Sequence, residues 1–293
     1  MQKTNTIDYV IFTDSACDIK ADLLKEWGVD YRPLFLRFDG EESMISNDEI
    51  TPEEFYQKMK AGGVAKTSAV NSEQFIEAFE QYLKSGVDIL YIGFSSGLST
   101  TFNSARLAAL DLREKYPDRK IEVIDTLAAS AGEGLLVYLA VKAKREGKTI
   151  DEVKDYIEKI KFNISIWFTV DDLVYLKRGG RVSAAAAFFG NMLGIKPVLH
   201  MDNEGHLIPV DKVRGRKTAI EALAKKFDEL ATDKENNTIF ISHASCLADA
   251  EKLSDMFFTR YGIKAEIITD VGPVIGAHAG PGTLALFFIG KER

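Results

Sequence analysis

The sequence contains few cysteines, few histidines and no excess of basic residues. Its 293 residues include two cysteines, Cys17 and Cys246, and four histidines, which are too few for a disulfide framework or a zinc cluster. The 37 lysines and arginines are outnumbered by 44 acidic residues, giving a net charge of −7. Nonspecific binding to nucleic acid or to anionic lipid is therefore not expected.

Long apolar runs are also missing. No stretch reaches the roughly eighteen apolar residues that a membrane-spanning helix needs, and residues 1–14 lack the charged start and apolar centre of a signal peptide. Together these absences predict a cytoplasmic protein with no stable membrane insertion, no nucleic-acid partner, no bound metal and no resident cofactor.

Short β-branched runs alternate with amphipathic stretches in the first half of the chain, a pattern typical of parallel strands joined by helices. We expect strands at 9–12, 87–94 and 120–125, and a long helix over about 128–146. Hydroxyl or carboxylate side chains follow each strand, and the carboxyl ends of parallel strands form the sheet edge where ligands bind. Asp14 and Asp125 could hold a metal there, but binding of backbone N–H groups is the simpler role.

From about residue 161 the pattern becomes richer in β-branched residues. Asn203-Glu204-Gly205 has turn chemistry between two such runs, which predicts a hairpin. Helices are expected after Ser183, Thr218 and Leu247. The sequence therefore predicts an α/β protein of two domains, a parallel-sheet domain over 1–161 and a mixed-sheet α/β domain over 162–293.

A polar segment over 38–71 separates the first two expected strands. Thr51-Pro52-Glu53-Glu54 is a capping box with proline at the first helical position, so a short helix should begin there. The following Lys66-Thr67-Ser68 is expected to lie in a loop. Near the start of the chain, we expect Asp18 to cap the first helix.

The pentapeptide "GFSSG" at 93–97 fits the nucleophile motif G-x-S-x-G and would make Ser95 a serine-esterase nucleophile. Asp125 or Asp270, together with His243 or His278, could complete a triad. However, one confident strand and one doubtful strand precede the motif, and no oxyanion segment lies upstream. The esterase is therefore the alternative interpretation.

The heptapeptide "SSGLSTT" at 95–101 carries five hydroxyls in seven residues at the expected start of a helix. Hydroxyls and free backbone N–H groups at a helix start favour binding of an anionic head group such as a carboxylate or phosphate.

His278 lies in "GAHAGPGT", where glycines and Pro281 predict a fixed turn that can approach a ligand closely. Two basic segments, "LKRGGRVS" and "DKVRGRKT", suit an acidic partner or a phosphate. Their arginines are Arg178, Arg181, Arg214 and Arg216.

Taken in order, several of these segments resemble the DegV family of bacterial proteins. The matching landmarks are "FTDSACD", "KTS", "SSGLSTTFNSA", "VIDTLAASAG", "LVYLKRGGRVS", "GIKPVL", "KVRGRKTAIEAL" and "GAHAGPGT". The resemblance implies two α/β domains with a lipid tunnel between them and a long-chain fatty acid as ligand. It also implies a carrier without catalysis of its own, which serves in some members as the binding subunit of a fatty-acid kinase and presents the carboxylate to a separate ATP-binding subunit.

Carried over to this sequence, the family's carboxylate contacts are Thr67, Ser96 and His278, with Ser95 as the alternative to Ser96. The chain departs from the family pattern at Ala69-Val70 and Thr100-Thr101, so the depth of the head group is left open. The four arginines named above are candidates for docking the kinase subunit or a phosphate. Candidates for the apolar lining are Phe94, Phe188, Phe189, Met192 and Leu193.

Overall fold

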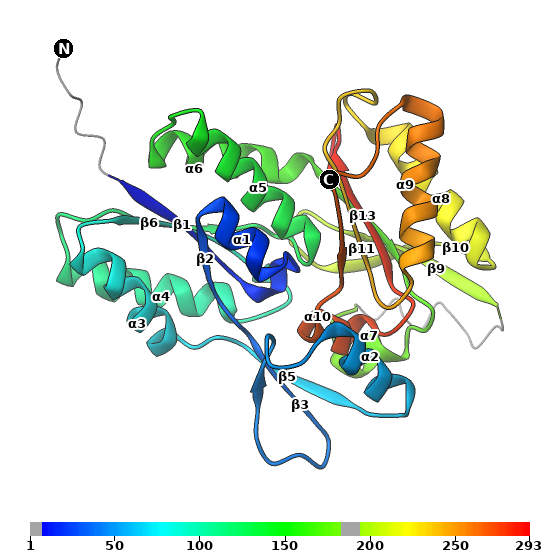
Figure 1. Cartoon of the computed structure of the whole chain (residues 1–293), viewed down its shortest axis with the longest axis horizontal. Coiled ribbons are helices and arrows are strands. Elements are labelled where there is room, and N and C mark those ends of the chain that lie inside the picture. The colour runs from blue at the N-terminus through cyan, green and yellow to red at the C-terminus, as the bar shows by residue number, and fades with distance from the viewer. Residues whose placement is uncertain (1–7, 183–193) are drawn as a thin grey trace.

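The computed structural model describes residues 8–182 and 194–293, and its described part contains three β-sheets with helices around and between them (Figure 1). The first is a parallel four-stranded sheet in the order β2-β1-β6-β7. The predicted strands of the first half are confirmed in it, and β2 was not predicted. Its strands are β1 (Tyr9–Asp14), β2 (Val29–Arg32), β6 (Asp88–Gly93) and β7 (Ile121–Asp125).

The second sheet is mixed and has six strands in the order β10-β9-β8-β13-β11-β12. Its strand pairs are antiparallel except for β11 and β12. The predicted hairpin is confirmed, since β9 and β10 pair with Met201 opposite Leu207. The α/β class with one parallel and one mixed sheet is thus as expected. The strands are β8 (Ile164–Thr169), β9 (Ile195–Met201), β10 (Leu207–Arg214), β11 (Ile239–His243), β12 (Ile267–Asp270) and β13 (Leu284–Ile289).

Helices cover the parallel sheet, and their starts follow ordinary capping chemistry. Capping boxes begin α3 at Asn71 and α6 at Thr149. Asp18 does not cap α1 as expected: it follows the short η1 in a left-handed conformation, and Lys20 is the N-cap. These elements are η1 (Ser15–Cys17), α1 (Ala21–Trp27), α3 (Ser72–Lys84), α4 (Thr101–Lys115), α6 (Ile150–Ile160) and η2 (Lys161–Asn163).

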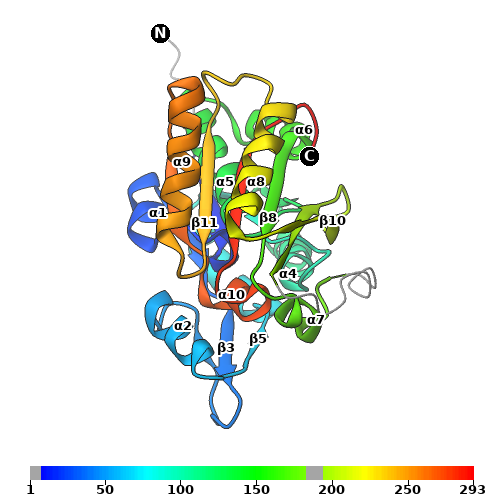
Figure 2. The same cartoon turned by 90° about the vertical axis from the view of Figure 1, so that its right-hand side faces the viewer.

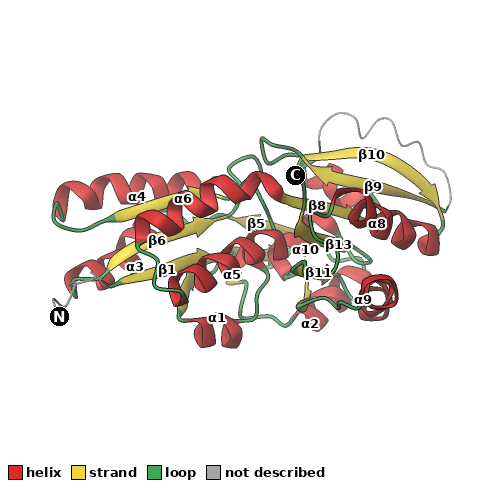
Figure 3. Ribbon diagram, turned by 90° about the horizontal axis from the view of Figure 1, so that it is seen from above, coloured by secondary structure: helices red, strands yellow, loops and turns green. Residues whose placement is uncertain are grey.

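Helix α5 (Ala131–Arg145) lies between the two large sheets (Figure 3). It packs on β1 and β6 on one side and on β8, β11 and β13 on the other, and side chains are buried around most of its circumference. Gly132 and Gly134 permit this, because a Cβ there would lie 2.8 Å from the Phe287 ring and 2.6 Å from Ile19. The boundary predicted near residue 161 falls between the strands of the two large sheets.

A third, antiparallel sheet forms at the polar segment over 38–71, where only a short helix and a loop were predicted. Its strands are β3 (Phe35–Phe38), which ends where this segment begins, β4 (Ile45–Ser46) and β5 (Ala65–Ser68), and α2 (Pro52–Lys60) lies between β4 and β5 in the chain. The capping box at Thr51 is confirmed. Thr67, expected in a loop, is on β5, where alternating half-buried and exposed residues pair with β3. Cross-strand hydrogen bonds hold this segment in place although its composition is polar.

The remaining helices belong to the second half of the chain. Helices α8 and α9 begin near the predicted positions, and the helix expected after Ser183 falls outside the described residues. None of the helices in ranges 8–182 and 194–293 combines the length and apolar character that crossing a membrane requires. The four helices are α7 (Val174–Gly179), α8 (Arg216–Leu230), α9 (Leu247–Tyr261) and α10 (Pro273–Ala279).

Helix α10 packs against the small sheet and α2, which come from the opposite end of the sequence (Figure 2). Gly276 allows the close approach, because a Cβ there would lie 2.4 Å from the Tyr56 hydroxyl oxygen. The Tyr56 hydroxyl donates a hydrogen bond to the Val271 carbonyl at 2.7 Å. These contacts with α2 fix the position of α10, and with it the position of His278.

Candidate functional site

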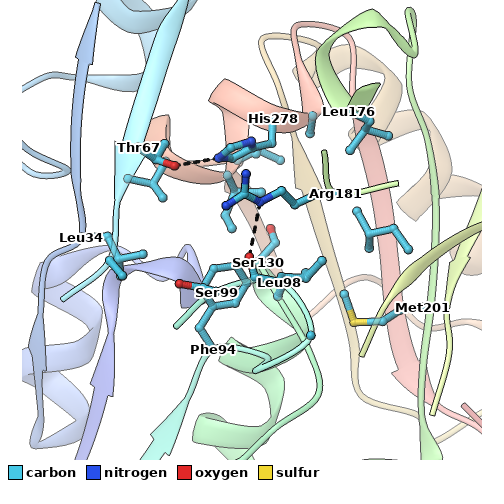
Figure 4. Close-up of a pocket in the computed structure, with 18 of the residues that line it drawn as sticks. Leu34, Thr67, Phe94, Leu98, Ser99, Ser130, Leu176, Arg181, Met201 and His278 are labelled. Carbon is cyan, nitrogen blue, oxygen red and sulfur yellow. Dashed lines mark hydrogen bonds between the residues drawn. The ribbon is translucent and has the colours of Figure 1, made fainter. Parts of the chain in front are cut away.

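A cavity of about 680 Å³ lies where the carboxyl ends of strands from both large sheets face β5 and α10 (Figure 4). This volume is within the ~300–1,000 Å³ of small-molecule sites. Apolar side chains make up most of its wall, and most of its polar groups are hydroxyls. Its apolar lining includes Leu34, Val70, Phe94, Leu98, Ile166, Phe168, Leu176, Met201, Leu207, Val271, Val274, Ile275 and Phe287.

Thr67 and His278 meet at one end of this cavity. The Thr67 hydroxyl and His278 Nε2 are 2.7 Å apart and form a hydrogen bond, and Figure 4 shows the two side chains pointing toward one another. His278 was expected in a turn, but it occupies the last turn of α10, and the left-handed glycines 280 and 282 follow it. The structure thus brings together two of the predicted carboxylate contacts.

The imidazole of His278 is electrically neutral under ordinary conditions. Burial, and secondarily the positive charge of Arg181, lower its pKa to about 4. Its Nδ1 has no hydrogen-bond partner among the described residues. Gly179 of α7 lies against this atom so closely that a Cβ would stand 2.2 Å away. The ring is therefore held between two helices and Thr67.

Arg181 is the only charged side chain among the cavity-lining residues that the structure describes, apart from the titratable His278. Its Nε donates a hydrogen bond to the Leu98 carbonyl at 3.4 Å, which joins the segment after α7 to the loop after β6. Figure 4 shows it beside His278. A single cation in a wall of apolar and hydroxyl groups favours one anionic group on a largely apolar ligand.

Ser96 lies at the exposed edge of the cavity. Asp125 positions its loop by accepting hydrogen bonds from the Ser96 and Leu127 N–H groups at 3.2 and 3.0 Å. Asp14 accepts from the N–H groups of Phe94 and Ala16. The prediction that these two carboxylates bind backbone N–H groups is confirmed. No group of three metal-ligating side chains is found within the described ranges.

Ser95 is not part of the cavity wall. Its side chain is fully buried, its hydroxyl donates to the Gly205 carbonyl at 3.0 Å, and its oxygen accepts from the Gly97 N–H at 3.1 Å. No hydrogen bond joins it to His243 or His278 in the described structure. The triad expected for an esterase is therefore not assembled at Ser95.

The other predicted arginines do not gather with Arg181. Arg178 is exposed and lies over the Tyr175 ring, and Arg214 is exposed at the end of β10. Arg216 is half-buried, and its guanidinium already donates to Asp249 at 2.8 Å and to the Gly282 carbonyl at 2.7 Å. It stabilises the glycine turn after α10 rather than facing a partner.

Two hydroxyls in the cavity wall, Ser130 and Ser242, escaped prediction. Ser242 lies near the carboxyl end of an apolar strand, which was an available signal, whereas Ser130 is the N-cap residue of α5, five residues after β7. Phe94 lines the cavity as expected. Phe188, Phe189, Met192 and Leu193, also predicted to line it, lie outside the described residues.

The model of the DegV family, a family of uncharacterised proteins, matches residues 8–291. The chain belongs to the DegV family. A DegV domain-containing protein from Clostridium perfringens is 44% identical, over 97% of this chain and 98% of its own length. The fold expected from the resemblance to this family is confirmed.

Two solved DegV-like structures connect this fold with lipid. A DegV family protein from Thermus thermophilus, which binds fatty acid, is 31% identical with a TM-score of 0.87, over 97% of this chain and 99% of its own. A stearic-acid-binding protein from Eubacterium ventriosum is 26% identical with a TM-score of 0.86, over 97% of this chain and 98% of its own. Each likeness covers 97% of this chain.

Replacing Ser95 by alanine should destabilise this DegV protein. The substitution leaves the Gly205 carbonyl and the Gly97 N–H without a partner, at a cost of about 1–3 kcal/mol in the free energy of unfolding. Denaturant unfolding measures the change. The same variant tests the esterase alternative. If the wild-type protein hydrolyses esters and Ser95→Ala abolishes this activity without lowering the free energy of unfolding, Ser95 is a nucleophile after all.

Acid should weaken the fold through His278. Because its pKa falls from 6.5 to about 4 on folding, the unfolded chain binds more protons between these values, and this contribution to stability is lost as pH falls through that window. Between about pH 7 and about pH 5, wild type should lose about 2 kcal/mol more than His278→Gln. Unfolding curves at both pH values measure this difference, and equal losses in the two proteins would contradict it.

Proposed function

We propose that this DegV protein is a cytoplasmic carrier that binds one long-chain fatty acid, with the carboxylate at Thr67, Ser96, His278 and Arg181. The observation that carries the proposal is the pairing of Thr67 with a neutral His278 beside Arg181, the one cation among the described residues of a mostly apolar wall. The fatty-acid binding of the relatives from Thermus thermophilus and Eubacterium ventriosum supports it.

The two ends of the cavity suit the two ends of such a ligand. A bare carboxylate in an apolar site is costly unless it is hydrogen-bonded. When His278 Nε2 donates to Thr67, the Thr67 hydroxyl proton is left for the carboxylate, and the Ser96 hydroxyl and the Arg181 guanidinium supply further donors. At roughly 0.8 kcal/mol for each buried CH₂, a dozen methylenes offer on the order of 10 kcal/mol before the costs of association. The tail therefore provides most of the affinity, and the head group fixes its orientation.

We further propose that the protein has no catalysis of its own and presents the carboxylate to a separate fatty-acid kinase subunit that carries ATP. Ser96 is exposed whereas the apolar wall is buried, so the head group would lie nearest the surface. Arg178 and Arg214 are exposed, and we propose them as contacts for an acidic or phosphate-bearing partner. We do not propose Arg216 for this role, because its guanidinium already donates to Asp249 and to the Gly282 carbonyl.

Protein purified from a bacterial host should carry its ligand. Because a long apolar tail leaves such a site slowly, organic extraction followed by mass spectrometry is expected to give about one long-chain fatty acid per chain. An extract with no acyl species, from protein that also fails to bind added octadecanoic acid, would overturn the proposed function.

Thr67→Val keeps the shape of the side chain and removes the hydroxyl. Hydrogen bonds to a charged group contribute about 1.5–3 kcal/mol, so the Kd for octadecanoic acid should rise roughly tenfold to a hundredfold. Isothermal titration of delipidated protein measures the change. Thr232→Val, at an exposed threonine whose hydroxyl binds the Ile289 carbonyl, is the matched control and should leave the Kd unchanged. A Thr67 variant that binds like wild type removes Thr67 from the carboxylate site.

A further inference from the structure

A second polar group lies in the cavity wall, and its hydrogen bonds do not include Thr67 or His278. The hydroxyls of Ser130 and Ser242 are 2.9 Å apart, and Ser130 donates to Asp18 Oδ2 at 2.5 Å. All three side chains are buried, and both serines line the cavity. Asp18 follows η1, Ser130 is the N-cap residue of α5, and Ser242 is the next-to-last residue of β11.

Ser242 belongs to the part of the wall that would face an acyl tail. Across the sheet it stands opposite Ala285 of β13, and Ala285 stands opposite Phe168 of β8. Ala285, Phe168 and the neighbouring Phe287 all line the cavity. The hydroxyl of Ser242 thus interrupts an otherwise apolar row at the carboxyl end of its strand.

Two of these residues, Ser130 and Asp18, have strained backbone conformations. Ser130 has φ 54° and ψ −148°, and Asp18 has φ 52° and ψ 28°. Non-glycine residues in such conformations are strained, and glycine would relieve the strain at either position. The chain instead keeps a hydroxyl and a carboxyl that bond to one another, next to the cavity.

The direction of the hydrogen bonds leaves one position for a ligand. Ser242 donates to Ser130 when Ser130 donates to Asp18, so the lone pairs of the Ser242 oxygen remain to accept a further bond. Burial raises the pKa of Asp18 to about 8, and a protonated Asp18 permits the reverse direction, in which Ser242 donates. A hydroxyl on the ligand both donates and accepts, so it fits either direction, whereas a methylene fits neither.

We propose that Ser130 and Ser242, backed by Asp18, form a subsite for a hydroxyl carried on the acyl chain, so that the ligands include monohydroxylated long-chain fatty acids. This inference rests on the proposed function, since it places the carboxylate at Thr67 and His278. The distance between the two polar groups along the tail then selects the position of the hydroxyl.

Calorimetric titration with octadecanoic acid and with a series of its monohydroxylated isomers, bearing the hydroxyl at each carbon in turn, tests the subsite. One isomer, or two adjacent ones, should bind at least about fivefold more tightly than the isomers hydroxylated elsewhere. If a hydroxyl weakens binding equally at every position of the chain, the subsite proposal is wrong but the proposed carrier function is unaffected. Failure of octadecanoic acid and of every isomer to bind overturns the carrier function itself.

Two variants assign the preference to these serines. Ser242→Ala should abolish the positional preference and bind octadecanoic acid more tightly, because a methyl group replaces a hydroxyl against the tail. Ser130→Gly, which suits φ 54°, should also abolish it. Ser165→Ala is the matched control. Ser165 is a buried serine of β8 whose neighbour Ile166 lines the cavity, so its own side chain faces away. A preference that persists in both variants would overturn the assignment.

Discussion

The hydrogen bond between Thr67 and His278 joins residues 211 positions apart, and the site depends on it. It requires β5 of the small sheet to reach α10 of the second half, which in turn requires Tyr56 and Gly276 to fix the contact between α2 and α10. Burial keeps the imidazole uncharged, so the pair costs less to enclose than an ion pair would. In the proposed carrier, this uncharged pair would receive the single anionic group of the ligand.

Acidic residues at the strand ends serve as scaffold in this chain. Asp14 and Asp125 accept backbone N–H groups of the loops that shape the cavity. Glu133 on α5 is fully buried and accepts from the Thr13 hydroxyl at 3.0 Å, and burial raises its pKa. Carboxylates that resemble a metal site in the sequence thus act by orienting backbone, which explains why Ser96 and its neighbours hold a defined position.

Most strands could be predicted from the sequence because apolar β-branched runs are local signals. The third sheet could not, because "AKTS" is polar and becomes the strand of Thr67 through pairing with β3. The turn predicted at His278 is a helix for a similar reason: Pro273 starts it, and packing against α2 and β5 stabilises seven residues that would not be helical alone. Thr67 and His278 were predicted as ligands from family resemblance, whereas Ser130 and Ser242 meet only through tertiary structure.

The hydroxyls of Ser95 and Thr283 donate to backbone carbonyls rather than to a base. A serine nucleophile needs a base within hydrogen-bond reach of its proton, but the Ser95 proton goes to the Gly205 carbonyl and the Thr283 proton to carbonyls at the end of α10. These bonds hold the hydroxyls as fixed dipoles instead of activating them. In the proposed carrier, a head group beside Thr67, the Arg181 guanidinium and the neutral imidazole of His278 would be held by hydrogen bonds, and chemistry on it would come from another molecule.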